Sequence, residues 1–170
     1  MPYTEKLGVV QTVRHAVAID EKRSKFKYQS VSANHIDLKE VFFAGVHSDV
    51  GGTYKEEGLS KIALFWMLGE AIEKDLILKS KEIKHYVLGT GNSPFKGPDI
   101  LQPIHNSFRF YYWIINPFPR RRKIESGSLI HYSVVSKKAK DENYNPKNLN
   151  DLHLENMEIE NDILSMSNRI

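Results

Sequence analysis

The stretch that most constrains the fold is Val41–Gly52, where an apolar run changes abruptly into polar residues and glycine. The run Val41–Val46 has no polar side chain, and so short an apolar run is typical of a strand covered on both faces, as in a parallel sheet. The next three residues are His47, Ser48 and Asp49. We therefore expect them at the carboxyl end of a buried strand, the edge where open α/β sheets bind ligands.

A helix is expected soon after this strand. Leu59–Lys74 is apolar almost all round, with only a narrow polar strip, which predicts a helix packed on more than one side. Between the two elements, Gly51 and Gly52 permit either a tight turn or a close approach of the backbone to a substrate. This unit of strand, glycine-rich loop and helix indicates an α/β fold.

The remaining segments carry weaker signals. Apolar residues at three- and four-residue spacings predict a helix over Gly8–Arg23, whereas the polar stretch Lys27–Glu40 predicts a loop. Both Ile83–Leu88 and Leu129–Val135 fit a strand or a short helix. The glycines of Gly89–Pro94 are not followed by the lysine of a phosphate-binding loop, so an ordinary loop is expected there.

Composition narrows the classes of site. A chain of 170 residues makes one domain, and a net charge of +3 does not by itself indicate a nucleic-acid partner. The absence of cysteine rules out a disulfide framework and a thiolate nucleophile. The first residues lack a signal-peptide core, and no run approaches the roughly 20 apolar residues of a membrane span. We expect no cofactor and no metal.

Two neighbouring segments are candidates for contact with lipid. Gly97–Phe118 is dense in aromatic residues, including Trp113, and fits either a buried irregular segment or a lid that faces lipid. The basic run that follows contains Arg120, Arg121 and Arg122. Such a run is usually solvated but can also meet phospholipid headgroups.

The sequence from Phe42 to Gly52, continued by Leu59, Ile62–Leu64 and Trp66–Met67, resembles a bacterial α/β-hydrolase family of uncharacterised-domain type. That family includes the phospholipase effectors of type VI secretion systems. Further similar segments follow in the family's order: His15–Arg23, Ile104–Ser107, Pro119–Arg121, Ile130–Val134 and Tyr144–Leu149. The resemblance covers roughly residues 2–150.

The resemblance implies the C-terminal portion of an α/β-hydrolase fold over residues 1–150, a partial and mostly parallel sheet with flanking helices. Residues 151–170 are then a polar tail, either frayed or weakly helical. It implies that His47 is the base that activates a serine. Asp49 either orients His47 or shapes the loop by accepting backbone N–H bonds, and the second role is common for Asp in such turns. Ser48, Gly51 and Gly52 would support this loop.

The nucleophile is the missing part. Ester hydrolysis in this fold needs a serine within Gly-x-Ser-x-Gly, and no segment of the sequence fits that pattern. In the family the serine and the first acid lie upstream of the histidine loop. We therefore expect a lipase- or phospholipase-like piece that is inactive alone, in the cytoplasm or delivered by type VI secretion. Its expected partners are an N-terminal hydrolase half that carries Ser and Asp, and a phospholipid surface.

Such a piece would have an exposed sheet edge. With the upstream strands absent, Val41–Val46 is expected to lose a parallel neighbour, which favours association with a partner or poor solubility.

Two other functions stay open. One is a non-catalytic module that binds a membrane or a protein through the aromatic cluster and the arginines. The other is a metal-dependent hydrolase that uses His47 and Asp49 with His35 or Asp37, although further ligands at defined spacings are not evident.

Overall fold

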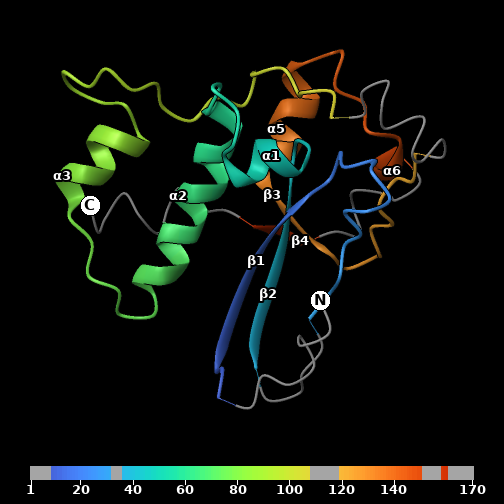
Figure 1. Ribbon diagram of the computed structural model, residues 1–170, viewed down its shortest axis with the longest axis horizontal. Coiled ribbons are helices and arrows are strands. Elements are labelled where there is room, and N and C mark those ends of the chain that lie inside the picture. The colour runs from blue at the N-terminus through green and yellow to red at the C-terminus, as the bar shows by residue number, and fades with distance from the viewer. Residues whose placement is uncertain (1–8, 32–35, 108–118, 151–157, 161–170) are drawn as a thin grey trace.

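The computed structural model describes residues 9–31, 36–107, 119–150 and 158–160. Within these ranges, a four-stranded sheet has the order β1-β2-β3-β4, and all neighbouring strands are parallel (Figure 1). The strands are β1 (Thr12–Ala18), β2 (Asp37–Phe43), β3 (Leu129–His131) and β4 (Glu158–Glu160). The helices are α1 (His47–Gly51), α2 (Gly58–Ile72), α3 (Ser80–Glu82), the π-helix η1 (Ile83–Val87), α5 (Tyr132–Lys140) and α6 (Lys147–Asn150).

The apolar run of β2 is buried because both of its faces are covered. Val41 and Phe43 point to one face and pack with α2 residues, among them Trp66. Phe42 and Ala44 point to the other face, into a cluster that also contains residues of α5 and α6. Figure 1 shows α2 beside the β1–β2 pair. The expected parallel sheet with flanking helices is therefore present, which confirms the α/β class.

The N-terminal segment is a strand, so the predicted helix over Gly8–Arg23 was wrong. Residues Thr12–Ala18 form β1 and pair in parallel with β2. The apolar positions of this segment fit a helical period, but pairing with β2 places Val17 opposite Phe42 and buries it. Tertiary pairing thus outweighed the local pattern, as it often does for β-branched residues.

The histidine stretch also differs from expectation. The strand ends at Phe43, and His47–Gly51 form the short helix α1 instead of a loop. The start of the strand lies earlier, because the predicted loop Lys27–Glu40 ends in the first residues of β2. The predicted helix after it is confirmed as α2. Of the two alternatives for Ile83–Leu88, the helical one is found, as η1.

The open edge of the sheet is not where we expected it. β2 lies between β1 and β3, so it keeps a neighbour on each side. Among the described residues the two edge strands are β1, which pairs with β2, and the three-residue β4, which pairs with β3. Residues 158–160 form β4, not the frayed or helical tail predicted there. In the described part of the chain, no helix has both the length and the apolar composition needed to cross a bilayer.

The turn from β2 into α1 requires glycine at position 45. Gly45 has a φ of +121°, and a Cβ atom there would lie 2.5 Å from the Cβ of Asp49. We expect Gly45→Ala to lower the free energy of unfolding by about 2–4 kcal/mol, because it adds backbone strain and a clash. Urea denaturation measures the loss.

Gly51→Ala is the matched control for this substitution. It also lies in the α1 region, has no heavy atom within 4 Å of an added Cβ, and is helical, where alanine is favoured. It should change the free energy of unfolding by less than about 1 kcal/mol. Equal losses in both variants would show that the turn at Gly45 is not specific.

Candidate functional site

Asp49 is the buried centre of the site. It lies in the first turn of α1, and its side chain is 0% exposed. Its Oδ2 accepts a hydrogen bond from the backbone N–H of Val46 at 3.0 Å, which satisfies a donor at the start of the helix and places negative charge at its positive end. This contact is of the kind expected if Asp49 shapes the loop by accepting backbone N–H bonds, a role that stays a prediction.

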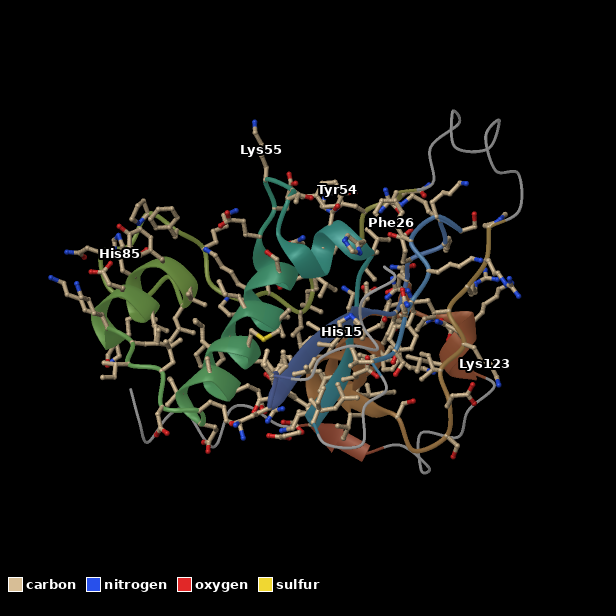
Figure 2. The ribbon with its side chains drawn as sticks, turned by 60° about the horizontal axis from the view of Figure 1, so that its bottom comes forward. His15, Phe26, Tyr54, Lys55, His85 and Lys123 are labelled. Carbon is tan, nitrogen blue, oxygen red and sulfur yellow. The ribbon has the colours of Figure 1, made fainter. Side chains whose placement is uncertain are left out.

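His105 contacts the other side of this carboxylate. Its Nδ1 lies 2.6 Å from Asp49 Oδ1, and its backbone N–H donates to Asp49 Oδ2 at 3.2 Å. The ring stacks on Tyr54 with centroids 3.8 Å apart, and Figure 2 shows Tyr54 beside α1. The His105 side chain is 28% exposed, so a buried acid holds a solvent-accessible imidazole, as in a catalytic Asp-His pair.

The second ring nitrogen of His105 faces a weaker partner. Nε2 lies 3.3 Å from Glu56 Oε2, and the Glu56 side chain is 61% exposed. Such an exposed contact contributes little stability. The Nε2 atom can therefore exchange Glu56 for another hydrogen-bonding group.

The segment that carries His105 is anchored from two sides. Gln102 accepts a hydrogen bond from the Gly58 N–H at 2.6 Å and donates to the Glu56 carbonyl at 3.2 Å. From α5, the buried Lys137 donates to the carbonyls of Ile100 and Gln102, each at 2.9 Å. The position of His105 thus depends on both α2 and α5.

His47 has a different environment. It is exposed at the first residue of α1, its backbone N–H donates to Glu21 Oε2 at 3.2 Å, and its ring lies 5.1 Å from the Phe26 ring. Asp49 is occupied by Val46 and His105, so the alternative that it orients His47 has no contact to support it in the described ranges. The role of His47 as a base stays a prediction.

The other predicted loop residues lie in or beside α1. Ser48 accepts a hydrogen bond from Gly52 N through its carbonyl, and Gly52 ends the helix in the left-handed conformation with a φ of +79°. Gly51 is exposed within the helix. These residues form the scaffold around Asp49.

The predicted lipid contacts are divided. Trp113 and the other aromatic residues of the cluster all lie outside the described residues. Arg120 and Arg121 are exposed. Arg122 is partly buried and donates to the carbonyls of Ala18 at 2.8 Å and Phe26 at 3.2 Å, so it holds β1 to the segment after it.

Two adjacent carboxylates at the end of β1 have opposite pKa shifts. Burial raises the pKa of Asp20 to about 6, although Gly45 N–H and Tyr144 O–H donate to it. Burial also acts to raise the pKa of Glu21, but hydrogen bonds from Arg23 and from the His47 N–H outweigh it and lower that pKa to about 2. The ionised form is therefore disfavoured at Asp20 and favoured at Glu21.

No group of three or more His, Asp or Glu side chains suited to a metal ion occurs in the described part of the chain. His35, which the metal-hydrolase alternative invoked, lies outside it.

A comparison of the chain with models of known families supports its resemblance to the phospholipase-effector family. Residues 1–70 match the family model described as "T6SS, Phospholipase effector Tle1-like, catalytic domain". The match includes β1, β2, α1 and most of α2, and this is the family that the motif around His47 resembles. No curated protein and no solved structure matched the chain.

The pKa of Asp20 predicts how stability depends on pH. A carboxyl whose pKa is raised from 3.8 to about 6 on folding contributes stability below about pH 4 that is lost as the pH rises through 6. We expect Asp20→Asn to be more stable than the wild type at neutral pH by about 2–3 kcal/mol. The difference should vanish near pH 4 in denaturation series.

Glu21→Gln is the opposite control. Its lowered pKa contributes stability above about pH 4, so this variant should be less stable than the wild type at neutral pH. A stability difference for Asp20→Asn that does not change with pH would contradict the buried environment of Asp20.

Proposed function

We propose that this chain supplies the acid and the base of a serine-dependent ester hydrolase of the phospholipase-effector type. The observation that carries the proposal is the 2.6 Å contact between the buried Asp49 carboxylate and Nδ1 of His105, at the carboxyl end of a parallel sheet. The order of the two residues also supports it, because in α/β-hydrolases the acid precedes the histidine along the chain. The family match over residues 1–70 supports the substrate class.

The mechanism follows from the orientation of the ring. In the neutral imidazole whose Nδ1–H donates to Asp49, Nε2 carries no proton and can accept one. The contact with the Glu56 carboxylate needs a proton on Nε2, so it is lost in this form. When a serine Oγ attacks the ester carbonyl, its proton moves to Nε2, and the buried carboxylate stabilises the resulting imidazolium. The same proton then passes to the leaving alkoxide oxygen. Glu56, held at 3.3 Å, would be displaced by the serine.

The serine in this proposal comes from outside the 170 residues, since no Gly-x-Ser-x-Gly occurs among them. The edge of β1 is the proposed place for that partner. A groove of about 1140 Å³ includes β1 residues Val13–Ala16 and Ala18, the exposed side of α2, and the Lys25–Gln29 segment. A parallel strand bound there would end at the same sheet edge as β2.

His47 is the second candidate for the base. It lies in the groove along β1, on the side where a partner strand would end, and it is exposed. In this alternative Asp49 and His105 hold the loop, and the partner supplies the acid for His47. A binding module is the alternative function, since the same groove presents the exposed apolar side chains of Leu64, Tyr86 and Phe95.

The two histidines are separated by paired substitutions. The chain is mixed with the serine-bearing half, and hydrolysis of a short-chain ester is measured for the wild type, His105→Gln and His47→Gln. If His105 is the base, its substitution should lower kcat by about 10³-fold or more, whereas His47→Gln should change it by less than about fivefold. Circular dichroism checks that both variants are folded.

The reverse pattern would assign the base to His47 and leave Asp49–His105 a structural pair. Activity of the lone chain that a chelator removes would favour the metal-dependent hydrolase. Vesicle binding with no hydrolysis in any mixture would favour the binding module.

The location of the partner has its own test. Hydrogen exchange of β1 amides should slow by about tenfold or more when the serine-bearing half is added, because the outer N–H groups of β1 gain partners. Amides in the middle of α2, which are already bonded within the helix, serve as the internal control. Protection confined to other segments would place the partner elsewhere.

A further inference from the structure

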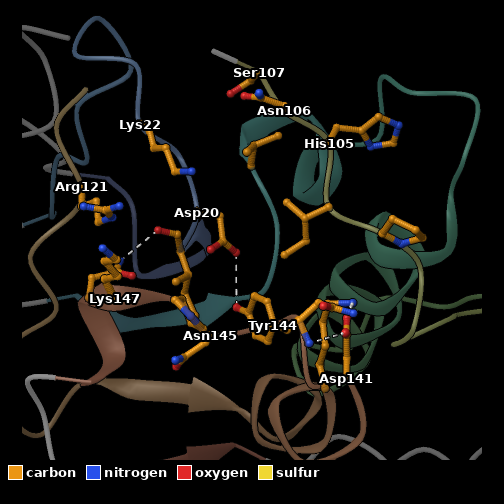
Figure 3. A pocket seen from close by; sticks show the side chains of 18 of the residues that line it. Asp20, Lys22, His105, Asn106, Ser107, Arg121, Asp141, Tyr144, Asn145 and Lys147 are labelled. Atoms are coloured by element: carbon orange, nitrogen blue, oxygen red, sulfur yellow. Dashed lines mark hydrogen bonds and ion pairs between the residues drawn. The ribbon is translucent and has the colours of Figure 1, made fainter. Parts of the chain in front are cut away.

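A cavity of about 760 Å³ lies beside His105, at the same end of the sheet. Its walls carry exposed cationic side chains from separate segments: Lys22, which follows β1, Arg121, and Lys147 of α6. Figure 3 shows these three side chains around Asp20, with His105 on the opposite wall. Lys140 adds a further cation to the lining.

Hydrogen bonds to backbone carbonyls join the three segments. Arg120 N–H donates to the Lys22 carbonyl at 3.0 Å. Asn148, next to Lys147, donates from its Nδ2 to the carbonyls of Ile19 at 3.1 Å and Arg122 at 3.3 Å. The three cations are therefore held on one cavity by the fold and do not come together by chance on a flexible surface.

Several other cations in the described ranges already have partners. Arg23, Lys123 and Lys137 each form an ion pair with a carboxylate, and Arg122 is bonded to carbonyls. For Lys22, Arg121 and Lys147, no carboxylate of the described residues lies within ion-pair distance. Three positive charges around one cavity repel each other, so an anion between them would be stabilising.

The carboxylates in the cavity are already engaged. Asp20 accepts hydrogen bonds from the Gly45 N–H and the Tyr144 O–H, and its pKa is raised to about 6 by burial. Asp141 pairs with Lys137 at 3.3 Å and accepts from Asn143 N–H at 3.1 Å. The charge of Lys22 acts on Asp20 and lowers its pKa, but neither carboxylate forms an ion pair with Lys22, Arg121 or Lys147 among the described residues.

We propose that this cavity binds a phosphate group, through Lys22, Arg121 and Lys147. A tetrahedral phosphate presents several oxygens in different directions, which suits three separate cations, and arginine can bind two of these oxygens at once. The phosphate belongs to a phospholipid headgroup or to a free phosphate ester. If the ligand is a phospholipid, its ester bonds would lie near His105, which lines the same cavity. That role of His105 rests on the proposed function, whereas the phosphate site does not.

The site is tested by titrating the full chain with inorganic phosphate and glycerol 3-phosphate, using calorimetry or backbone NMR shifts. Lys22→Gln, Arg121→Gln and Lys147→Gln should each weaken binding by roughly five- to tenfold, as expected for the loss of one charged contact. Arg120→Gln and Lys123→Gln are the matched controls, since both remove an exposed charge outside the cavity lining. They should change binding by less than about twofold.

A second experiment with lipid vesicles tells whether the phosphate belongs to a lipid headgroup or to a soluble phosphate ester. Phosphatidylglycerol and phosphatidylcholine vesicles are compared, and glycerol 3-phosphate is added as competitor. Vesicle binding that Arg121→Gln weakens and the competitor displaces assigns a headgroup, whereas binding of the soluble phosphates alone assigns a free phosphate ester. The absence of saturable phosphate binding would overturn the proposal, as would equal losses in Arg120→Gln and Arg121→Gln.

Discussion

The carboxylate of Asp49 is the interaction on which the arrangement of this molecule depends. It is fully buried, so its charge is tolerated only because each oxygen has a partner: the N–H groups of Val46 and His105, and the His105 ring. A buried charge without such partners costs several kcal/mol. The same three contacts start α1, fix the path of the segment that carries His105, and aim an imidazole into solvent.

Two of the hollows in the described chain are lined by residues next to that carboxylate. The cavity lined by His105 is bordered by cations on rigidly joined segments. The groove along β1 is larger, about 1140 Å³, and its lining includes residues of β1, a strand with one sheet neighbour among the described residues. We propose a phosphate group for the first and an extended polypeptide for the second. A shared sheet edge brings the two together, which is the usual place for chemistry in α/β folds.

The sequence predicts the elements that depend on neighbouring residues better than those that depend on contacts between residues far apart in the chain. β2 and α2 were predictable, because the apolar run of β2 and the apolar residues on nearly all sides of α2 indicate burial from the local sequence alone. β1 was not predictable, because its apolar residues fit both a helical and a strand period. Only its pairing with β2 makes it a strand. Asp49 was singled out as a loop residue, because it lies shortly before a glycine pair. His105 was not, because its partner lies 56 residues away along the chain and only folding brings the two together.

The segment that carries His105 is anchored by Lys137, a residue far beyond the matched part of the chain. The family match ends at residue 70, yet the imidazole that meets its acid, and the ammonium group that holds the path to it, both come later in the chain. The matched residues therefore include Asp49, whereas its partner His105 lies in the part of the chain that the family model does not match. Residues 1–70 taken alone would keep Asp49 but lose the His105 ring that contacts it and the Lys137 ammonium group that anchors the His105 segment.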